Sequence, residues 1–146
     1  MNHPLYPKAL VFLQFTTMGM MILFSKNFFS SIFFILIFSL GVFLGVWAIK
    51  HNEIGNFNIQ PKLKDGSKLI TSGIYSYIRH PMYSSVIVMM LAFLLSTPSL
   101  EEGLLFVLLL VVLFFKAKRE EYLWIQEHPA YKEYQKKTKF FIPYLL

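Results

Sequence analysis

The sequence of 146 residues contains no cysteine, and this absence removes three kinds of chemistry at once. Without thiols the chain forms no disulfide, offers no thiolate to a metal ion and has no cysteine nucleophile. Charged residues are also scarce, at 15% of the chain, whereas 55% of the residues are hydrophobic. A soluble domain of this size is about 45–50% apolar, and here the excess is gathered in runs, so the composition favours a membrane protein.

The few charges are mostly basic and give a formal net charge of +6 at pH 7. In a soluble protein this excess would suggest a nucleic-acid partner. Because the lysines and arginines flank apolar runs, the excess indicates a lipid bilayer instead, and no nucleic-acid partner is predicted. No metal site is predicted either, because the histidines at positions 3, 51, 80 and 128 have no partner four residues away.

Apolar runs divide the chain and predict four membrane helices, near residues 9–24, 28–49, 82–96 and 100–127. At about 1.5 Å per residue, runs of this kind approach or exceed the thickness of a hydrocarbon core of about 30 Å. The predicted fold class is therefore an all-α integral membrane helical bundle, with residues 1–146 forming a single domain.

The fourth predicted helix has a start signal and no early stop signal. Ser99 and Glu102 have the spacing of a capping box, so a helix should begin directly after Ser99. Nothing breaks the pattern before Pro129, and the helix is expected to continue beyond the membrane. A short helix is expected after Pro129, with Tyr131 and Tyr134 on one face.

Polar and small residues inside the apolar runs predict contacts between helices. Gln14 is expected to form a hydrogen bond with another helix rather than to act in chemistry. Gly41 and Gly45 form a Gly-x-x-x-Gly pair that lets another backbone approach closely. Packing inside the monomer is preferred over a dimer interface for this pair, and the oligomeric state stays open.

Basic residues fall almost entirely on one side of the predicted bundle. One precedes the first helix, five lie in the segment 50–80 and seven follow from Lys116 onward, which is 13 of the 14. Lys26 is the exception. Because cytosolic loops are rich in lysine and arginine, the segment 50–80 and both termini are expected in the cytosol. The prediction is a multi-pass protein of the inner or plasma membrane.

Two clusters of reactive side chains should meet at the cytosolic ends of the third and fourth helices. One is Arg79-His80-Pro81-Met82-Tyr83, where Pro81 suits a first helical turn and the helix start favours anions. The other is Glu120-Glu121. Since a short turn joins the two helices, they should be antiparallel neighbours. The clusters should then share one pocket edge, rimmed also by Tyr75, Tyr77 and Trp124.

Each cluster alone also has a plain structural interpretation. Basic residues at a helix end are usually anchors at the membrane interface. Glutamates beside lysine and arginine usually belong to a solvated helix face. Adjacent residues lie about 100° apart on a helix, so Glu120 and Glu121 need not face the same pocket.

The stretch Gly73-Ile74-Tyr75-Ser76-Tyr77-Ile78-Arg79-His80-Pro81-Met82-Tyr83 resembles a signature of the isoprenylcysteine carboxyl methyltransferase and phospholipid methyltransferase superfamily. Glu120-Glu121 is similar to the second signature of that superfamily. Asn56-Phe57-Asn58-Ile59 ahead of Pro61-Lys62, and Tyr131-x-x-Tyr134 ahead of Phe140-x-x-Pro143, are similar to further patterns. The resemblance covers residues 41–143.

The resemblance implies an integral membrane enzyme that uses S-adenosylmethionine to methylate a lipophilic or membrane-associated acceptor at a cytosolic cofactor pocket. It implies a set of cofactor-binding residues, namely Tyr75, Arg79, His80, Pro81, Tyr83, Glu120 and Glu121. Arg79 and Glu121 are also assigned to catalysis. The acceptor stays open, as does methylation at oxygen, nitrogen or sulfur, because the Gly-x-Gly element of the phospholipid branch has no clear counterpart. Two alternatives are an NADPH-dependent membrane reductase of the same fold and a non-enzymatic membrane protein.

Overall fold

The computed structural model describes residues 5–52, 58–63 and 66–142, and the regular secondary structure in these ranges is helical. Within these ranges there is no β-strand, only an isolated bridge between Ile78 and Lys139, so the all-α prediction is confirmed. The elements in chain order are α1 (Leu5–Phe24), η1 (Phe28–Ser30), α2 (Ile32–His51), η2 (Gly73–Ser76), α3 (Pro81–Ser96), α4 (Leu100–Glu127) and α5 (Tyr131–Lys137). Several residues named above, including Asn56, Phe57 and Pro143, lie outside the described ranges.

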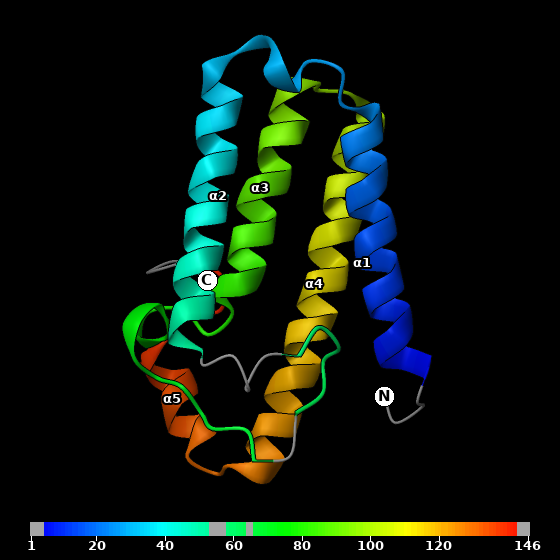
Figure 1. Ribbon diagram of the computed structural model, residues 1–146. Coiled ribbons are helices and arrows are strands. Elements are labelled where there is room, and N and C mark those ends of the chain that lie inside the picture. Colours follow the sequence, from blue (N-terminus) through cyan, green and yellow to red (C-terminus); the bar gives the residue numbers. More distant parts are fainter. Residues whose placement is uncertain (1–4, 53–57, 64–65, 143–146) are drawn as a thin grey trace.

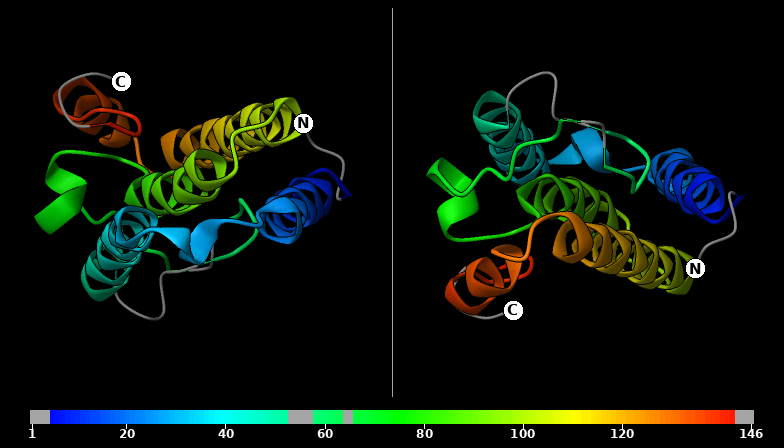
Figure 2. Two further views of the ribbon diagram at one scale, coloured as in Figure 1. Left: turned by 90° about the horizontal axis from the view of Figure 1, so that it is seen from above. Right: turned by 90° about the horizontal axis from the view of Figure 1, so that it is seen from below.

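The four long helices stand side by side as two pairs (Figure 1). α2 packs along α3 and α1 packs along α4, while α3 also contacts α4 and joins the pairs. Figure 2 shows the same pairing from the two ends of the bundle. The lower end in Figure 1 gathers the start of α1, the end of α2, the start of α3, the end of α4 and α5. The basic segments of the chain therefore meet at one end of the bundle.

Local capping explains where the helices begin. The Ser99 side chain accepts a hydrogen bond from the Glu102 backbone N–H at 3.2 Å, as the capping box predicts. The reciprocal half of the box is not formed, because both carboxylate oxygens of Glu102 are buried without a hydrogen-bond partner. Pro81 opens α3, also as predicted. α4 has the predicted bounds and runs unbroken from Leu100 to Glu127.

The starts of the first two predicted helices each differ from the structure by four residues. The first helix begins at Leu5, four residues earlier than residue 9. The run predicted to be helical from residue 28 is interrupted, because Ser31 has extended backbone angles, φ −145° and ψ 138°. The Ser31 side chain accepts a hydrogen bond from the Phe33 N–H, so it caps a new helix and separates η1 from α2.

Among the described residues, two helices are long and apolar enough to cross a membrane, namely α1 and α2. Only 11% of the most apolar 18-residue window of α2 is buried inside the protein. The side chains of α2 therefore need another apolar environment, which a bilayer supplies. α3 is apolar but has only 16 residues. α4 has 28 residues and reaches about 42 Å, longer than a hydrocarbon core. The number of four spans stays a prediction.

The Gly-x-x-x-Gly pair of α2 packs against α3 in the same chain. A Cβ on Gly41 would lie 2.6 Å from Met89 Cγ, and a Cβ on Gly45 would lie 2.7 Å from Ser85 Oγ. The Ser85 hydroxyl donates a hydrogen bond to the Gly41 carbonyl at 2.7 Å. Close helix approach through small residues is thus used inside the monomer, which confirms the preferred interpretation.

Candidate active site

The two predicted clusters meet where α3 begins and where α4 extends below its apolar part. Arg79 Nε donates to Glu121 Oε1 at 2.6 Å. The His80 ring lies between the glutamates, with Nδ1 3.6 Å from Glu120 Oε2 and Nε2 3.5 Å from Glu121 Oε1. The Tyr83 hydroxyl donates to Glu120 Oε1 at 2.5 Å. The antiparallel arrangement of α3 and the unbroken α4 therefore bring together residues about forty positions apart, as predicted.

The segment after α5 fixes the backbone that leads into α3. The Arg79 N–H donates to the Lys139 carbonyl at 2.8 Å, and the His80 N–H donates to the Phe140 carbonyl at 3.2 Å. The Lys139 N–H in turn donates to the Tyr77 carbonyl at 2.9 Å. The backbone N–H groups of Arg79 and His80 are thus used within the protein, so an anion at this helix start would have to be held by other groups.

The Arg79 side chain joins three elements. Its Nη1 donates to the carbonyl oxygens of Gln135, at 3.1 Å, and of Thr138, while its Nε binds Glu121. These carbonyls lie at the C-terminal end of α5, where a cation is favoured by the helix dipole. The guanidinium is also 5.5 Å from the centre of the Phe140 ring. Arg79 therefore holds the start of α3, the extension of α4 and α5 together.

Glu120 and Glu121 have different surroundings, as their angular separation on α4 allows. Glu120 lines the cavity described below, whereas Glu121 is 3% exposed and faces Arg79 and His80. Burial raises the pKa of Glu121, but the hydrogen bonds and charges of His80 and Arg79 outweigh it and lower that pKa to about 2. Burial lowers the pKa of His80, yet the two glutamates outweigh it and raise that pKa. The site therefore favours a charged imidazole between two carboxylates.

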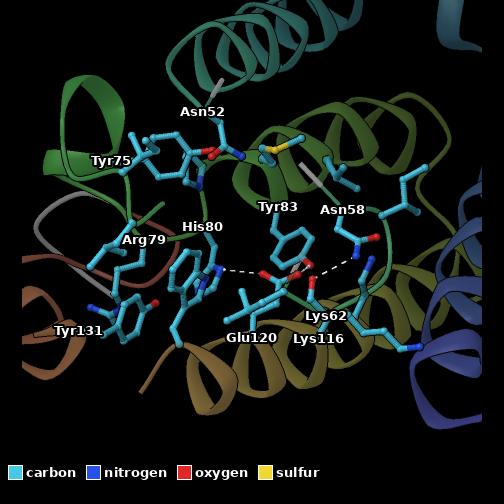
Figure 3. A pocket seen from close by; sticks show the side chains of 18 of the residues that line it. Asn52, Asn58, Lys62, Tyr75, Arg79, His80, Tyr83, Lys116, Glu120 and Tyr131 are labelled. Carbon is cyan, nitrogen blue, oxygen red and sulfur yellow. Dashed lines mark hydrogen bonds and ion pairs between the residues drawn. The ribbon is translucent and has the colours of Figure 1, made fainter. Parts of the chain in front are cut away.

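A cavity of about 290 Å³ lies at this end of the bundle (Figure 3). Among its labelled lining residues, Tyr75, Arg79, His80 and Tyr131 lie toward one end and Asn58, Lys62 and Lys116 toward the other. Tyr83 and Glu120 lie between them, and Asn52 lines the cavity from the end of α2. Pro81 and Trp124 also line it. Six of the seven cofactor residues implied by the resemblance thus lie on the cavity wall, and Glu121 lies behind it.

Tyr77 does not rim the cavity, so that prediction is wrong. It is 53% exposed, whereas Tyr75 and Ile78 are buried. Tyr77 follows η2, in which Ile74 and Tyr75 are buried, and precedes Ile78, which is buried at its bridge to Lys139. Tyr75 and Ile78 therefore point inward together and Tyr77 points away. The Tyr134 hydroxyl donates to the Tyr75 carbonyl at 2.6 Å and anchors this turn to α5, where Tyr131 and Tyr134 share a buried face as predicted.

Lys116 also lines the cavity, although its place in the sequence indicated only the membrane topology. It is 2% exposed, and its Nζ donates to Gln14 Oε1 of α1 at 2.5 Å. This contact confirms the prediction that Gln14 forms a hydrogen bond between helices. The position of Lys116 four residues before Glu120 was a usable signal, since such residues share one helix face.

The matching family model spans both clusters. The phospholipid methyltransferase model matches residues 29–132, more than half of the 146 residues. The chain belongs to the phospholipid methyltransferase family. No curated protein matches the chain significantly.

Family membership assigns the chain to the superfamily that the sequence resembles. The protein is accordingly a membrane methyltransferase, which favours the methyltransferase interpretation over the reductase and the non-enzymatic alternatives. α1 lies outside the residues matched by the phospholipid methyltransferase model, as does the segment after α5 that binds Arg79 and His80.

Proposed function

We propose that the protein transfers a methyl group from S-adenosylmethionine to a lipophilic acceptor that reaches the cavity from the membrane. The observation that carries this proposal is the cavity between the start of α3 and the extension of α4. It combines the Glu120 carboxylate and the His80 imidazole with tyrosine rings, at the end of the bundle where basic residues gather.

The residues of the cavity suit the chemical groups of S-adenosylmethionine. The Glu120 carboxylate is an acceptor for an ammonium group or for ribose hydroxyls. The Tyr75 and Tyr131 rings offer faces for an adenine and for a sulfonium cation. His80 Nδ1 lies 3.6 Å from Glu120 Oε2, so the imidazole helps to hold the carboxylate that lines the cavity.

When bound, S-adenosylmethionine supplies a methyl group whose bond to sulfur breaks as a bond to the acceptor forms, with the electron pair remaining on sulfur. The protein then has to bind both partners, align them and exclude water, and it needs no nucleophile of its own. We assign Arg79 and Glu121 to positioning, because their ion pair holds α3, α4 and α5 around the cavity. His80, Pro81, Tyr83 and Glu120 are assigned to direct contact with the cofactor.

The proposal includes an orientation in the membrane. The lower end of the bundle in Figure 1 faces the cytosol, because the described basic residues of the segments 58–80 and 116–139 gather there. Lys26 lies in the turn at the opposite end. With four spans, the cavity opens at the cytosolic interface, where both a water-soluble cofactor and a membrane-dissolved acceptor have access.

Calorimetric titration of the purified protein in neutral detergent tests the cofactor. The wild type is expected to bind S-adenosylmethionine and not NADPH. Glu120→Gln keeps the shape but removes the charge, and a charge-assisted contact of about 1.5–3 kcal/mol corresponds to a roughly tenfold to hundredfold loss of affinity. Glu133→Gln is the matched control, because Glu133 is exposed on α5 away from the cavity. Binding of NADPH instead, or equal affinity in Glu120→Gln, would contradict the proposal.

A further inference from the structure

The end of the cavity away from Tyr75 holds a buried lysine that the cofactor chemistry does not use. Lys116 lies one helical turn before Glu120 on α4 and on the same helix face (Figure 3). At about 1.5 Å per residue, it is about 6 Å nearer the apolar part of the helix. Its Nζ donates to Gln14 Oε1 and lies 5.2 Å from the centre of the Tyr83 ring. Gln14 precedes residues 29–132, which the family model matches.

The Lys116 ammonium is incompletely satisfied. It has three donors, and the structure supplies one amide oxygen and one aromatic ring. Across the described ranges, no ion pair within 4.0 Å involves Lys116. A buried charge is costly unless it is paired, and an ionisable group facing the interior of a membrane bundle marks a functional site. The remaining donors of Lys116 therefore need an acceptor from the cavity that the residue lines.

The charged residues around the cavity indicate whether a cationic or an anionic ligand group is favoured there. Lys62 and Lys116 line the cavity, and Glu120 supplies the single carboxylate among the described lining residues. Glu120 is already bound by the Tyr83 hydroxyl and lies within ion-pair distance of His80. Among the described residues the Lys116 ammonium thus has no carboxylate within 4.0 Å, and its charge favours an anionic ligand group.

Apolar side chains beside Lys116 provide an exit toward the membrane. Phe15 and Met18 of α1 and Val86 of α3 line the cavity at this end. Phe15 is also 53% exposed. The cavity thus reaches the apolar outer surface of α1, so a hydrocarbon chain can extend from it directly into lipid.

We infer that Lys116, oriented by Gln14, binds the anionic group of a lipophilic acceptor whose apolar chain leaves the cavity past Phe15. The shared chemistry is an anion, either a carboxylate or a phosphate, on an amphiphile dissolved in the membrane. The inference rests on the proposed methyltransferase function where it identifies the ligand as the methyl acceptor. The anionic character of the ligand follows from the residues of the cavity. The anion would lie about one helical turn deeper than Glu120, which leaves the cofactor end free.

Binding of defined amphiphiles tests the inference without activity. The protein in neutral detergent is titrated with dodecanoate, dodecyl phosphate and dodecanol, and saturable binding is followed by the fluorescence of Trp124, which lines the cavity. Trp47→Phe serves as the background, because the chain has only two tryptophans. At least one anionic probe is expected to bind roughly tenfold more tightly than dodecanol, and the preferred anion identifies a carboxylate or a phosphate as the source.

Variants then assign the anion to Lys116. Lys116→Met should lose roughly tenfold or more in affinity for the anionic probe, since a charge-assisted contact is removed. Lys116→Arg should retain tight binding, because it keeps the charge. Lys132→Met, on the exposed face of α5, is the matched control and should bind like the wild type. Replacing a buried charge by a hydrophobic residue of similar volume is often neutral or stabilising, and a thermal melt of Lys116→Met checks the fold.

Three results overturn the inference. They are equal affinity for dodecanol and the anionic probes, an unchanged affinity in Lys116→Met, and a Lys116→Met variant that loses S-adenosylmethionine but keeps the probe. The last result would place Lys116 in the cofactor site. If the wild type binds no S-adenosylmethionine, the proposed function fails, and the dependence of anion binding on Lys116 still decides the subsite.

Discussion

Two ion pairs in this protein have the same length and opposite surroundings, and they give the sharpest test of how the site is held together. Arg79 and Glu121 lie 2.6 Å apart with side chains 11% and 4% exposed. Lys136 and Glu133 also lie 2.6 Å apart, with side chains 70% and 66% exposed. Removing one partner of a buried pair costs about 3–5 kcal/mol, because a charge is left uncompensated. An exposed pair contributes about 0–1 kcal/mol.

Glu121→Ala and Glu133→Ala remove the same side chain from a helix in the two settings. With about 2–4 °C of melting temperature per kcal/mol, Glu121→Ala should lower the melting temperature by roughly 6–20 °C. Glu133→Ala should lower it by at most about 4 °C. Thermal melts of the purified variants in detergent, without cofactor, make the comparison. Equal small shifts would refute the reasoning, and Arg79 and Glu121 would then act on a ligand rather than on the fold.

The same pair also predicts a dependence on acid. The pKa of Glu121 is lowered to about 2 in the folded protein from an ordinary 4.5. A lowered carboxyl pKa stabilises the folded state fully above pH 4.5, and this contribution is lost as the pH falls through about 2. The difference in melting temperature between the wild type and Glu121→Ala should therefore be largest above pH 4.5 and shrink toward pH 2.

Two further predictions concern the bundle. Gly41→Ala should destabilise by about 1–3 kcal/mol, because its Cβ would lie 2.8 Å from the Met89 backbone nitrogen, whereas Gly19→Ala meets nothing within 4 Å and should not destabilise in the same thermal melts. Single cysteines at Asn27 and Ser67, introduced into a chain that has none, should label from opposite sides of intact cells. Labelling from the same side would contradict the orientation.

Structural features that depend on neighbouring residues could be predicted from the sequence. Ser99 and Pro81 mark helix starts through backbone hydrogen bonds and a fixed φ, which neighbouring residues determine. The length of α4 follows from the absence of a breaker before Pro129. The meeting of Arg79 with Glu121 was also predictable, because a short connection makes α3 and α4 antiparallel. The break at Ser31 was missed, since an apolar run around a serine does not show whether the backbone leaves the helix there.

Only the tertiary structure decided which side chains face the cavity and which hold it. Glu120 and Glu121 are adjacent in sequence, and the packing of α5 against Arg79 puts one on the cavity wall and the other behind it. In the sequence Lys116 is one of many basic residues, whereas in the structure it is a buried cavity residue that binds Gln14, 102 positions away. Such contacts depend on how whole helices pack, because burial and electrostatic environment are properties of the assembled bundle rather than of any local stretch.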